Sequence, residues 1–312
     1  MGARDEQPRD DLWVRRSSSF GSQAAAYAEH RPDYAEAAVE WAVGPVRDRG
    51  RLRVLDMGAG TGKLTAMIAR LASPPDVSVV AVEPDPAMLA ELRSSLPGVT
   101  APPGRFGVTA PPGQAEGISP PARPLVTALP DQAEDIPPLG QPLVTALPGR
   151  AEDIPLPDAS MDAVLCGQAA HWFTMDLAVP EIARVLTPGG VFAGLWNMVD
   201  DREDWVAGLC RVCPQSATWS GWTGEPRDWP GSANASAFFA PADRAEFEHV
   251  RPRTADSLVA TIATHSRQLV MNPEERGQQL DRVRDYLLSR PETARGEFHM
   301  PMLTGVLRSV KI

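Results

Sequence analysis

The feature that most constrains this chain is a glycine-rich loop between an apolar strand and an amphipathic helix. Residues 51–56 read as a short buried strand that ends at Asp56. A glycine turn follows, and apolar residues then recur at helical spacing: Leu64, Met67, Ile68 and Leu71. A strand, a glycine turn and a helix in this order begin a parallel α/β sheet, and they place the turn at the sheet edge where ligands bind.

The remaining periodic segments continue this α/β pattern. Residues 77–82 form a β-branched strand that ends at Glu83, and a helix with Met88 on its apolar face follows. Residues 161–166 predict another strand, followed by a helix that ends before a turn at residues 188–190. Further strands are expected at residues 191–196 and 298–311. The fold class is therefore α/β, with the loop of residues 58–62 at its ligand-binding edge.

The spacing of the glycines indicates which class of ligand the loop can bind. The loop reads G-x-G-x-G, and Lys63 stands where a dinucleotide motif requires its third glycine. A phosphate-binding P-loop requires Ser or Thr after Gly-Lys, but Leu64 is there. Glu83 ends the second strand about twenty residues further on, where an acid can accept hydrogen bonds from ribose hydroxyls. The pattern favours a nucleoside cofactor without phosphates.

An internal repeat interrupts the α/β pattern. Residues 108–116 recur as residues 126–134 and 144–152, a period of eighteen, and a truncated copy starts at Val99. The copies are too proline-rich to stack as a solenoid, so we interpret residues 99–143 as an extended, solvated insertion. We expect one copy to occupy the sheet. The last is the best candidate, and deleting residues 99–143 should leave folding and cofactor binding intact.

The composition of the chain limits the kinds of partner that we expect. The formal net charge is −10 and no Lys/Arg cluster occurs, so nucleic acid is a poor candidate. No apolar run reaches eighteen residues, and the polar residues 1–11 do not resemble a signal peptide. Three cysteines do not suggest a disulfide framework. We expect a reduced, cytoplasmic protein without a membrane partner; the sequence does not indicate its oligomeric state.

Two segments outside the periodic pattern carry further expectations. Residues 1–19 are expected to be disordered, and residues 197–240 form an irregular, tryptophan-rich cap. The cap is either a lid with an aromatic wall for the ligand or an ordinary packed subdomain. Cys210 and Cys213 have C-x-x-C spacing, but two further zinc ligands are missing, so core packing is the better interpretation and no metal site is expected.

Four motifs resemble those of class I methyltransferases: residues 54–62, 80–85, 151–155 and 184–190. Gln-Ala-Ala-His-Trp-Phe at residues 168–173 and Tyr-Ala-Glu-His-Arg-Pro at residues 27–32 are similar to the type-11 bacterial branch that includes trans-aconitate methyltransferase-like enzymes. The resemblance covers nearly the whole chain from Phe20 and departs at the repeats. It implies a methyltransferase domain over residues 20–312. The implied sheet is Rossmann-like and mostly parallel, with an antiparallel last strand, helices on both faces and a small helical or loop cap.

The resemblance also implies S-adenosylmethionine as cofactor and assigns residues to it. Asp56 and the glycine loop hold the methionine end, Glu83 the ribose, and Glu152 and Asp153 flank the adenine. Glu134 and Asp135 in an earlier repeat offer the same dipeptide. Arg31 either meets the cofactor carboxylate or is an exposed surface arginine. The complete cofactor-binding set comprises Arg31, Asp56, Gly58, Ala59, Gly60, Thr61, Gly62, Glu83, Pro84, Met88, Glu152, Asp153 and Gln168.

The expected reaction is methyl transfer by in-line displacement to an O, N or C nucleophile of a small molecule. His171 follows a strand at the ligand-binding edge, so it is either the general base or a loop residue that packs beside Trp172. Two alternatives remain open: a non-catalytic S-adenosylmethionine-binding protein, and a methyltransferase for protein or RNA. A nicotinamide-dependent oxidoreductase conflicts with Lys63 in the loop.

Overall fold

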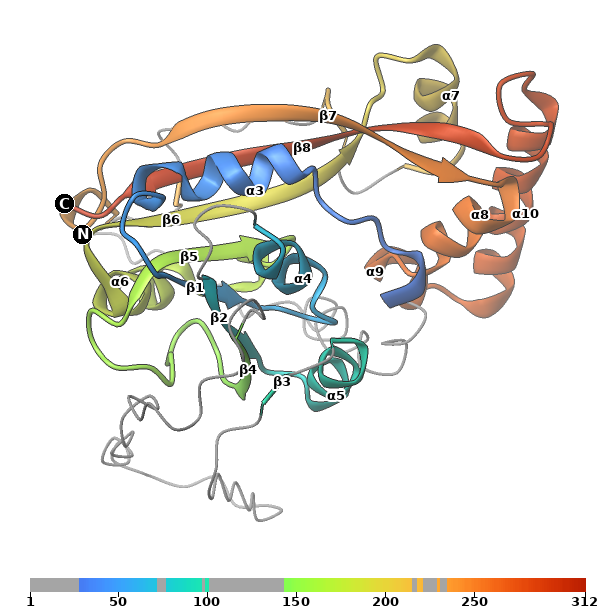
Figure 1. The fold of residues 1–312 in the computed structure, drawn as a ribbon. Coiled ribbons are helices and arrows are strands. Elements are labelled where there is room, and N and C mark those ends of the chain that lie inside the picture. Colours follow the sequence, from blue (N-terminus) through green and yellow to red (C-terminus); the bar gives the residue numbers. More distant parts are fainter. Residues whose placement is uncertain are drawn as a thin grey trace, which may run out of the picture.

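A computed structural model describes residues 28–71, 77–96, 99–100, 143–214, 218–220, 229–230 and 235–312, and its core is one eight-stranded sheet (Figure 1). The strand order is β3-β4-β2-β1-β5-β6-β8-β7. All strands are parallel except β8, which runs antiparallel to both β6 and β7. The bounds are β1 (Leu52–Met57), β2 (Val77–Glu83), β3 (Val99–Thr100), β4 (Leu143–Pro148), β5 (Met161–Gly167), β6 (Leu186–Val199), β7 (Asp243–Arg253) and β8 (Phe298–Val310). The predicted α/β class, mostly parallel with an antiparallel last strand, is confirmed; the expectation for residues 1–19 lies outside the described residues.

Helices cover both faces of the sheet because the central strands are apolar on both sides. Val54 and Val79 point to one face and pack with α3 (Glu36–Val43) and α4 (Lys63–Ala69). α5 (Pro86–Ser95) packs on the same face, against Ala81 and Ala146. Leu55 and Val80 point the other way, toward α6 (Met175–Val185). Alternating side chains with apolar residues on both faces are what a parallel sheet buried between two helical layers requires.

Two helices begin as their capping residues predict. The carboxylate of Asp85 accepts hydrogen bonds from the first-turn N–H groups of α5, at 2.8 and 3.0 Å, and Pro86 is its first residue. Asn272 caps α10 (Pro273–Ser289) in the same way, and Pro273 is the first residue of that helix. At seventeen residues α10 is the longest helix described, and none of the described helices is long and apolar enough to cross a membrane.

A helical cap lies beyond the carboxyl ends of the parallel strands. α7 (Asp204–Val212), α8 (Ala255–Ala263) and α10 share a hydrophobic core with the first residues of β8, and the short α9 (Ser266–Leu269) follows α8 (Figure 1). Cys213 is buried in this core and Cys210 packs against it, neither of them in a disulfide, so the core-packing interpretation of the C-x-x-C pair is confirmed. The cap therefore covers the sheet edge that carries the glycine loop.

The structure corrects three sequence expectations. β6 starts at Leu186 and runs through residues 188–190, where a turn was expected; a register shift against β5 and a positive φ at Gly189 accommodate this stretch. Residues 197–240 are less irregular than expected, since β6 continues to Val199 and α7 follows. β7 was missed because it is an edge strand with few apolar residues, paired only with β8.

The tryptophans of the cap segment pack against the protein where they are described. Trp229 lies 4.8 Å from Phe192 and 5.4 Å from Trp196, as measured between ring centroids. Trp205 packs edge-on against Phe298 within the cap core. Trp219 stacks under the guanidinium of Arg202. These contacts favour the packed subdomain over the aromatic lid.

Two repeat copies enter the sheet, where one was expected. The last copy supplies β4, whose Val144 and Thr145 pair with Val79 and Val80 of β2. The truncated copy supplies β3, and its Val99 and Thr100 pair in parallel with the same Val144 and Thr145. The truncated copy adds an edge strand because it carries the same short β-forming sequence, Val-Thr, as the last copy.

This pairing predicts the outcome of a seamless deletion. Removing residues 101–145 joins Thr100 to Ala146 and restores the sequence Val-Thr-Ala-Leu-Pro, so the truncated copy can take the place of β4 beside β2. We expect a folded protein with a melting temperature within a few degrees of wild type, because the edge pairing of β3 is the one strand pairing among the described residues that is lost. Aggregation of this variant, or loss of cofactor binding in calorimetry, would show that the removed residues are structural.

Candidate active site

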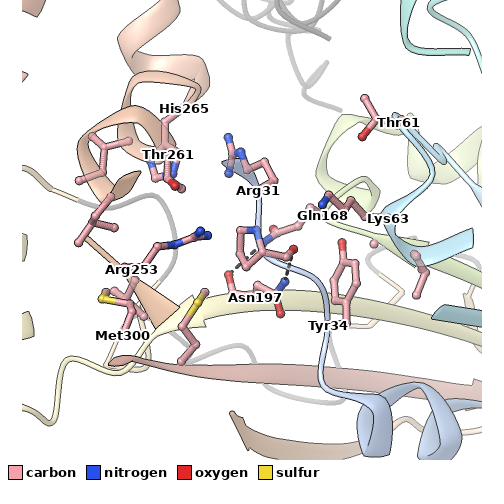
Figure 2. Close-up of a pocket in the computed structure, with 18 of the residues that line it drawn as sticks. Arg31, Tyr34, Thr61, Lys63, Gln168, Asn197, Arg253, Thr261, His265 and Met300 are labelled. Atoms are coloured by element: carbon pink, nitrogen blue, oxygen red, sulfur yellow. Dashed lines mark hydrogen bonds between the residues drawn. The ribbon is translucent and has the colours of Figure 1, made fainter. Parts of the chain in front are cut away.

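One cavity lies between the glycine-loop edge of the sheet and the helical cap (Figure 2). Its sheet side is formed by residues at or just beyond the carboxyl ends of β1, β5 and β6, which include Asp56, Gly167 and Asn197. Its cap side is formed by α7, α8, the start of β8 and the end of β7. Ligands of open α/β sheets bind at this edge, so the cavity is the candidate active site.

The glycine loop is shaped for close approach of a ligand. Gly58, Gly60 and Gly62 all have positive φ. A Cβ on Gly58 would lie 2.7 Å from the Cβ of Ala169, whereas a Cβ on Gly60 would meet no protein atom within 4 Å. The carboxylate of Glu83 holds the loop by accepting a hydrogen bond from Gly60 N at 2.8 Å. Gly60 therefore presents open backbone to the cavity.

Asp56 offers a buried carboxylate oxygen to the cavity. Thr65 Oγ1 donates to its Oδ2 at 2.6 Å, while Oδ1 has no hydrogen-bond partner among the described residues. Burial, with the nearby charge of Glu83 as a smaller contribution, raises the pKa of Asp56 to about 7. An unpartnered buried acceptor is costly unless a ligand satisfies it, so Asp56 suits a cationic group.

The segment of residues 31–34 is fixed across the sheet side of the cavity. Asn197 Nδ2 donates to the carbonyl oxygens of Pro32 and Asp33, at 3.3 and 3.1 Å, and Gln168 Nε2 donates to Asn197 O at 2.9 Å (Figure 2). Arg31 Nη2 donates to the carbonyl oxygen of Thr264 at 3.1 Å. Arg31 therefore lies between the cap and the glycine loop, and Gln168 is held with a positive φ at the end of β5.

The predicted cofactor residues divide into two groups. The first group lines the cavity and consists of Arg31, Asp56, Gln168 and the part of the loop from Gly58 to Thr61. Gly62 and Glu83 do not line the cavity but shape the loop: Gly62 caps α4, and the carboxylate of Glu83 accepts hydrogen bonds from the N–H groups of Gly60 and Asp85. The others do not line the described cavity: Pro84 and Asp153 are exposed, Met88 is buried in the first turn of α5, and Glu152 Oε1 accepts from Thr174 N at 2.7 Å.

His171 also does not line the cavity. It lies in a single turn of 3-10 helix, Ala170–Trp172, with its ring 4.7 Å from the ring of Trp172. The imidazole that does line the cavity belongs to His265, which follows α8. Burial, with the nearby charge of Arg31, holds the pKa of His265 well below its usual value, so this ring is neutral.

Sequence reasoning missed six polar residues that line the cavity, namely Tyr34, Lys63, Asn197, Arg253, Thr261 and His265. Asn197 directly follows the strand expected at residues 191–196, so its place at a strand end was a usable signal. Lys63 was noted only for excluding a dinucleotide motif. Arg253 and His265 carried no signal, because β7 and α8 were not predicted.

Comparison with known proteins shows which family this chain belongs to. The type-11 family model, described as a methyltransferase domain, matches residues 124–194. An uncharacterized methyltransferase of Mycobacterium tuberculosis is 33% identical over 295 residues, which cover 94% of this chain and 96% of that protein. An uncharacterized methyltransferase-like protein of Schizosaccharomyces pombe is 29% identical over 194 residues, or 62% of this chain and 57% of that protein.

Solved structures share the fold. A candidate type II methyltransferase of Anaeromyxobacter dehalogenans superposes with a TM-score of 0.50 at 20% identity, covering 90% of this chain and 97% of the other. A candidate methyltransferase of an antibiotic biosynthesis pathway in Anabaena variabilis gives a TM-score of 0.51 at 16% identity, covering 88% and 98%. Asp56 and the open Gly60 backbone fit S-adenosylmethionine, which brings an ammonium group and a nucleoside without phosphates. The chain belongs to the class I S-adenosylmethionine-dependent methyltransferases.

Proposed function

We propose that this enzyme methylates a small molecule bound on the cap side of the cavity. S-adenosylmethionine supplies the methyl group on a positively charged sulfur. The observation that supports the proposal is that the glycine loop and a separate, largely apolar surface from α7, α8 and β8 line the same cavity. A cavity with two such regions can hold cofactor and acceptor side by side.

We assign the cofactor contacts as follows. The free Oδ1 of Asp56 accepts from the ammonium group, and Arg31 pairs with the carboxylate in a charge-assisted bond. Glu83 retains lone pairs for the ribose hydroxyls beyond those used by Gly60 and Asp85. Asp153, five residues beyond β4 at the same sheet edge, is assigned to the adenine amino group. Glu152, which accepts a hydrogen bond from Thr174 N, is assigned to flank the adenine. The loop, Pro84, Met88 and Gln168 complete the predicted set.

Catalysis then depends mainly on alignment. Asn197 and Gln168 fix the segment that carries Arg31, and the cap covers the cavity. Holding two reactants in line can contribute roughly 7–11 kcal/mol at the limit. The predicted base, His171, is not supported by a cavity contact, whereas His265 is neutral and lines the cavity. Comparing His171→Gln with His265→Gln identifies the base, whose loss costs about 10²–10⁴-fold in rate for an acceptor that must lose a proton.

The nature of the acceptor is tested by labelling. The purified enzyme is incubated with methyl-labelled S-adenosylmethionine and a cell extract separated into small molecules, RNA and protein. We expect the label in the small-molecule fraction, and none there with a Gly60→Arg variant. Label in RNA or protein would contradict the proposal, and no transfer to any fraction would favour a non-catalytic binding protein. The likeness to the trans-aconitate methyltransferase-like branch and a cytoplasmic location stay predictions.

A further inference from the structure

The charged side chains that line the cavity are mostly positive, whereas the chain as a whole is negative. The chain has a formal net charge of −10, yet three cationic side chains line the cavity: Arg31, Lys63 and Arg253. Among the described lining residues the one carboxylate is Asp56, and His265 is neutral. An acidic protein that collects cations in its active site concentrates positive potential there, which attracts anions.

Two of these cations have partners other than the acceptor. Lys63 Nζ lies 3.4 Å from Asp33 Oδ1, an ion pair within the protein. Arg31 is assigned to the cofactor carboxylate. Arg253 is different: its Nη2 donates to the carbonyl oxygen of His30 at 2.9 Å, and no carboxylate of the described residues lies within ion-pair distance of it. Asp33, an acid whose charge acts on Arg253, pairs instead with Lys63 and Arg251.

The surroundings of Arg253 favour an anion. Burial and the neighbouring charge of Arg251 lower the pKa of Arg253 more than the charge of Asp33 raises it, so an anion beside the guanidinium would favour its charged form. A desolvated guanidinium without a carboxylate can present its N–H groups as a fork to a carboxylate or phosphate. Its bond to His30, a residue that Thr261 also contacts, fixes the guanidinium at the cap side (Figure 2).

The surface beside Arg253 is apolar. It is formed by side chains from three separate elements of the cap: Leu209, Leu258, Ile262, Met300 and Met302. Methionine side chains adapt to ligands of irregular shape, so this wall suits a hydrocarbon body rather than a sugar or a polyamine. A cationic fork beside an apolar wall is complementary to an amphipathic anion.

We propose that the methyl acceptor is an organic anion with an apolar body, and that Arg253 selects it by pairing with its carboxylate or phosphate. This inference rests on the proposed function, because it assigns the acceptor of that same cavity. Arg253 is then a specificity residue, because it binds the anionic group of the acceptor whichever atom receives the methyl group.

Calorimetry on the intact protein saturated with S-adenosylhomocysteine tests this with four probes of equal chain length: hexanoate, hexyl phosphate, hexylammonium and hexanol. We expect one of the two anions to bind at least about tenfold more tightly than hexanol and hexylammonium. That preference should fall to about twofold or less in Arg253→Gln and be partly kept in Arg253→Lys, which retains the charge without the fork. The matched control is Arg244→Gln on the same strand, which pairs with Glu246 outside the cavity and should leave the preference unchanged.

The outcomes separate the two proposals. Equal binding of hexanol and both anions, or an anion preference that survives in a folded Arg253→Gln, overturns the assignment of Arg253 while the methyltransferase proposal stands. Failure of S-adenosylhomocysteine itself to bind overturns both. If Arg253→Gln does not fold, the salt dependence of wild type decides: anion affinity should fall as NaCl rises from about 0.05 to about 0.5 M, and hexanol affinity should not.

Discussion

Replacing Asp56 with asparagine is expected to weaken S-adenosylmethionine binding by roughly ten- to hundredfold, the usual worth of a hydrogen bond to a charged group. The asparagine oxygen can still accept from Thr65, but its amide N–H₂ then faces the cavity where Oδ1 was. That group donates, and so it cannot accept from the cofactor's ammonium. Wild-type affinity should also fall by about tenfold for each pH unit below 7, because the pKa of Asp56 is raised to about 7 and binding requires the ionised carboxylate. Calorimetry from mildly acidic to mildly basic pH measures both effects.

The same substitution should make the unliganded protein more stable. The folded pKa of Asp56 lies above the unfolded value of 3.8, so its ionised form destabilises the fold; this cost grows as pH rises from about 4 to 7 and is constant above. Removing the charge should therefore raise the free energy of unfolding above pH 7 by as much as roughly 3–4 kcal/mol. Urea unfolding at acidic and basic pH should show the gain only at the higher pH.

Asp162→Asn is the matched control, since it also changes a buried aspartate of the central sheet. Arg53 donates to both carboxylate oxygens of Asp162, at 3.0 and 3.1 Å, and holds the pKa of that carboxyl below its usual value. The sign is therefore reversed: Asp162→Asn should lose stability at neutral pH, and cofactor affinity should not change because Asp162 lies outside the cavity. Loss of stability in Asp56→Asn as well would contradict the assigned role.

Replacing Gly60 with arginine is expected to abolish detectable binding of S-adenosylmethionine and S-adenosylhomocysteine. The new side chain meets no protein atom near its Cβ, so it extends into the cavity. The positive φ adds a cost of about 1–2 kcal/mol for a residue with a Cβ. Calorimetric titration with either ligand measures the loss, and thermal unfolding measures the cost.

Gly296→Arg is the control for that substitution. Gly296 also has a positive φ and an open Cβ position, but it is exposed and lies outside the cavity. The two variants should lose similar stability, and only Gly60→Arg should lose binding. Equal ligand affinity in both would mean that the glycine loop does not contact the cofactor.

The sequence predicted the central fold because local signals there are strong. Asp56, Gly58 and Glu83 lie at strand ends that apolar runs define on their own, and Asn272 marks a helix start. The two edges of the sheet were harder. β7 forms by pairing with β8, whose residues are distant in the sequence. β3 forms by pairing with β4, which is another copy of the same repeat. Local periodicity does not report such pairings.

The site was predictable on the cofactor side and hidden on the acceptor side. The loop from Gly58 to Thr61 is contiguous in the chain, and its glycine spacing is a motif that can be recognised from the sequence alone. The proposed acceptor side joins Leu209, Arg253 and His265, which are far apart in the sequence and meet at the cavity only in the folded protein. His171 was a natural candidate by its place after β5, but only the three-dimensional structure shows that His265 lines the cavity instead.

Calorimetric titration of the purified protein with S-adenosylmethionine and S-adenosylhomocysteine, with NADH as the control ligand, tests the cofactor most directly. The structure predicts micromolar binding of both nucleosides and none of NADH, because Lys63 stands where a dinucleotide loop needs glycine. Binding of NADH in preference, or of no ligand by a folded protein, would contradict the assignment of the glycine loop and Asp56 to S-adenosylmethionine.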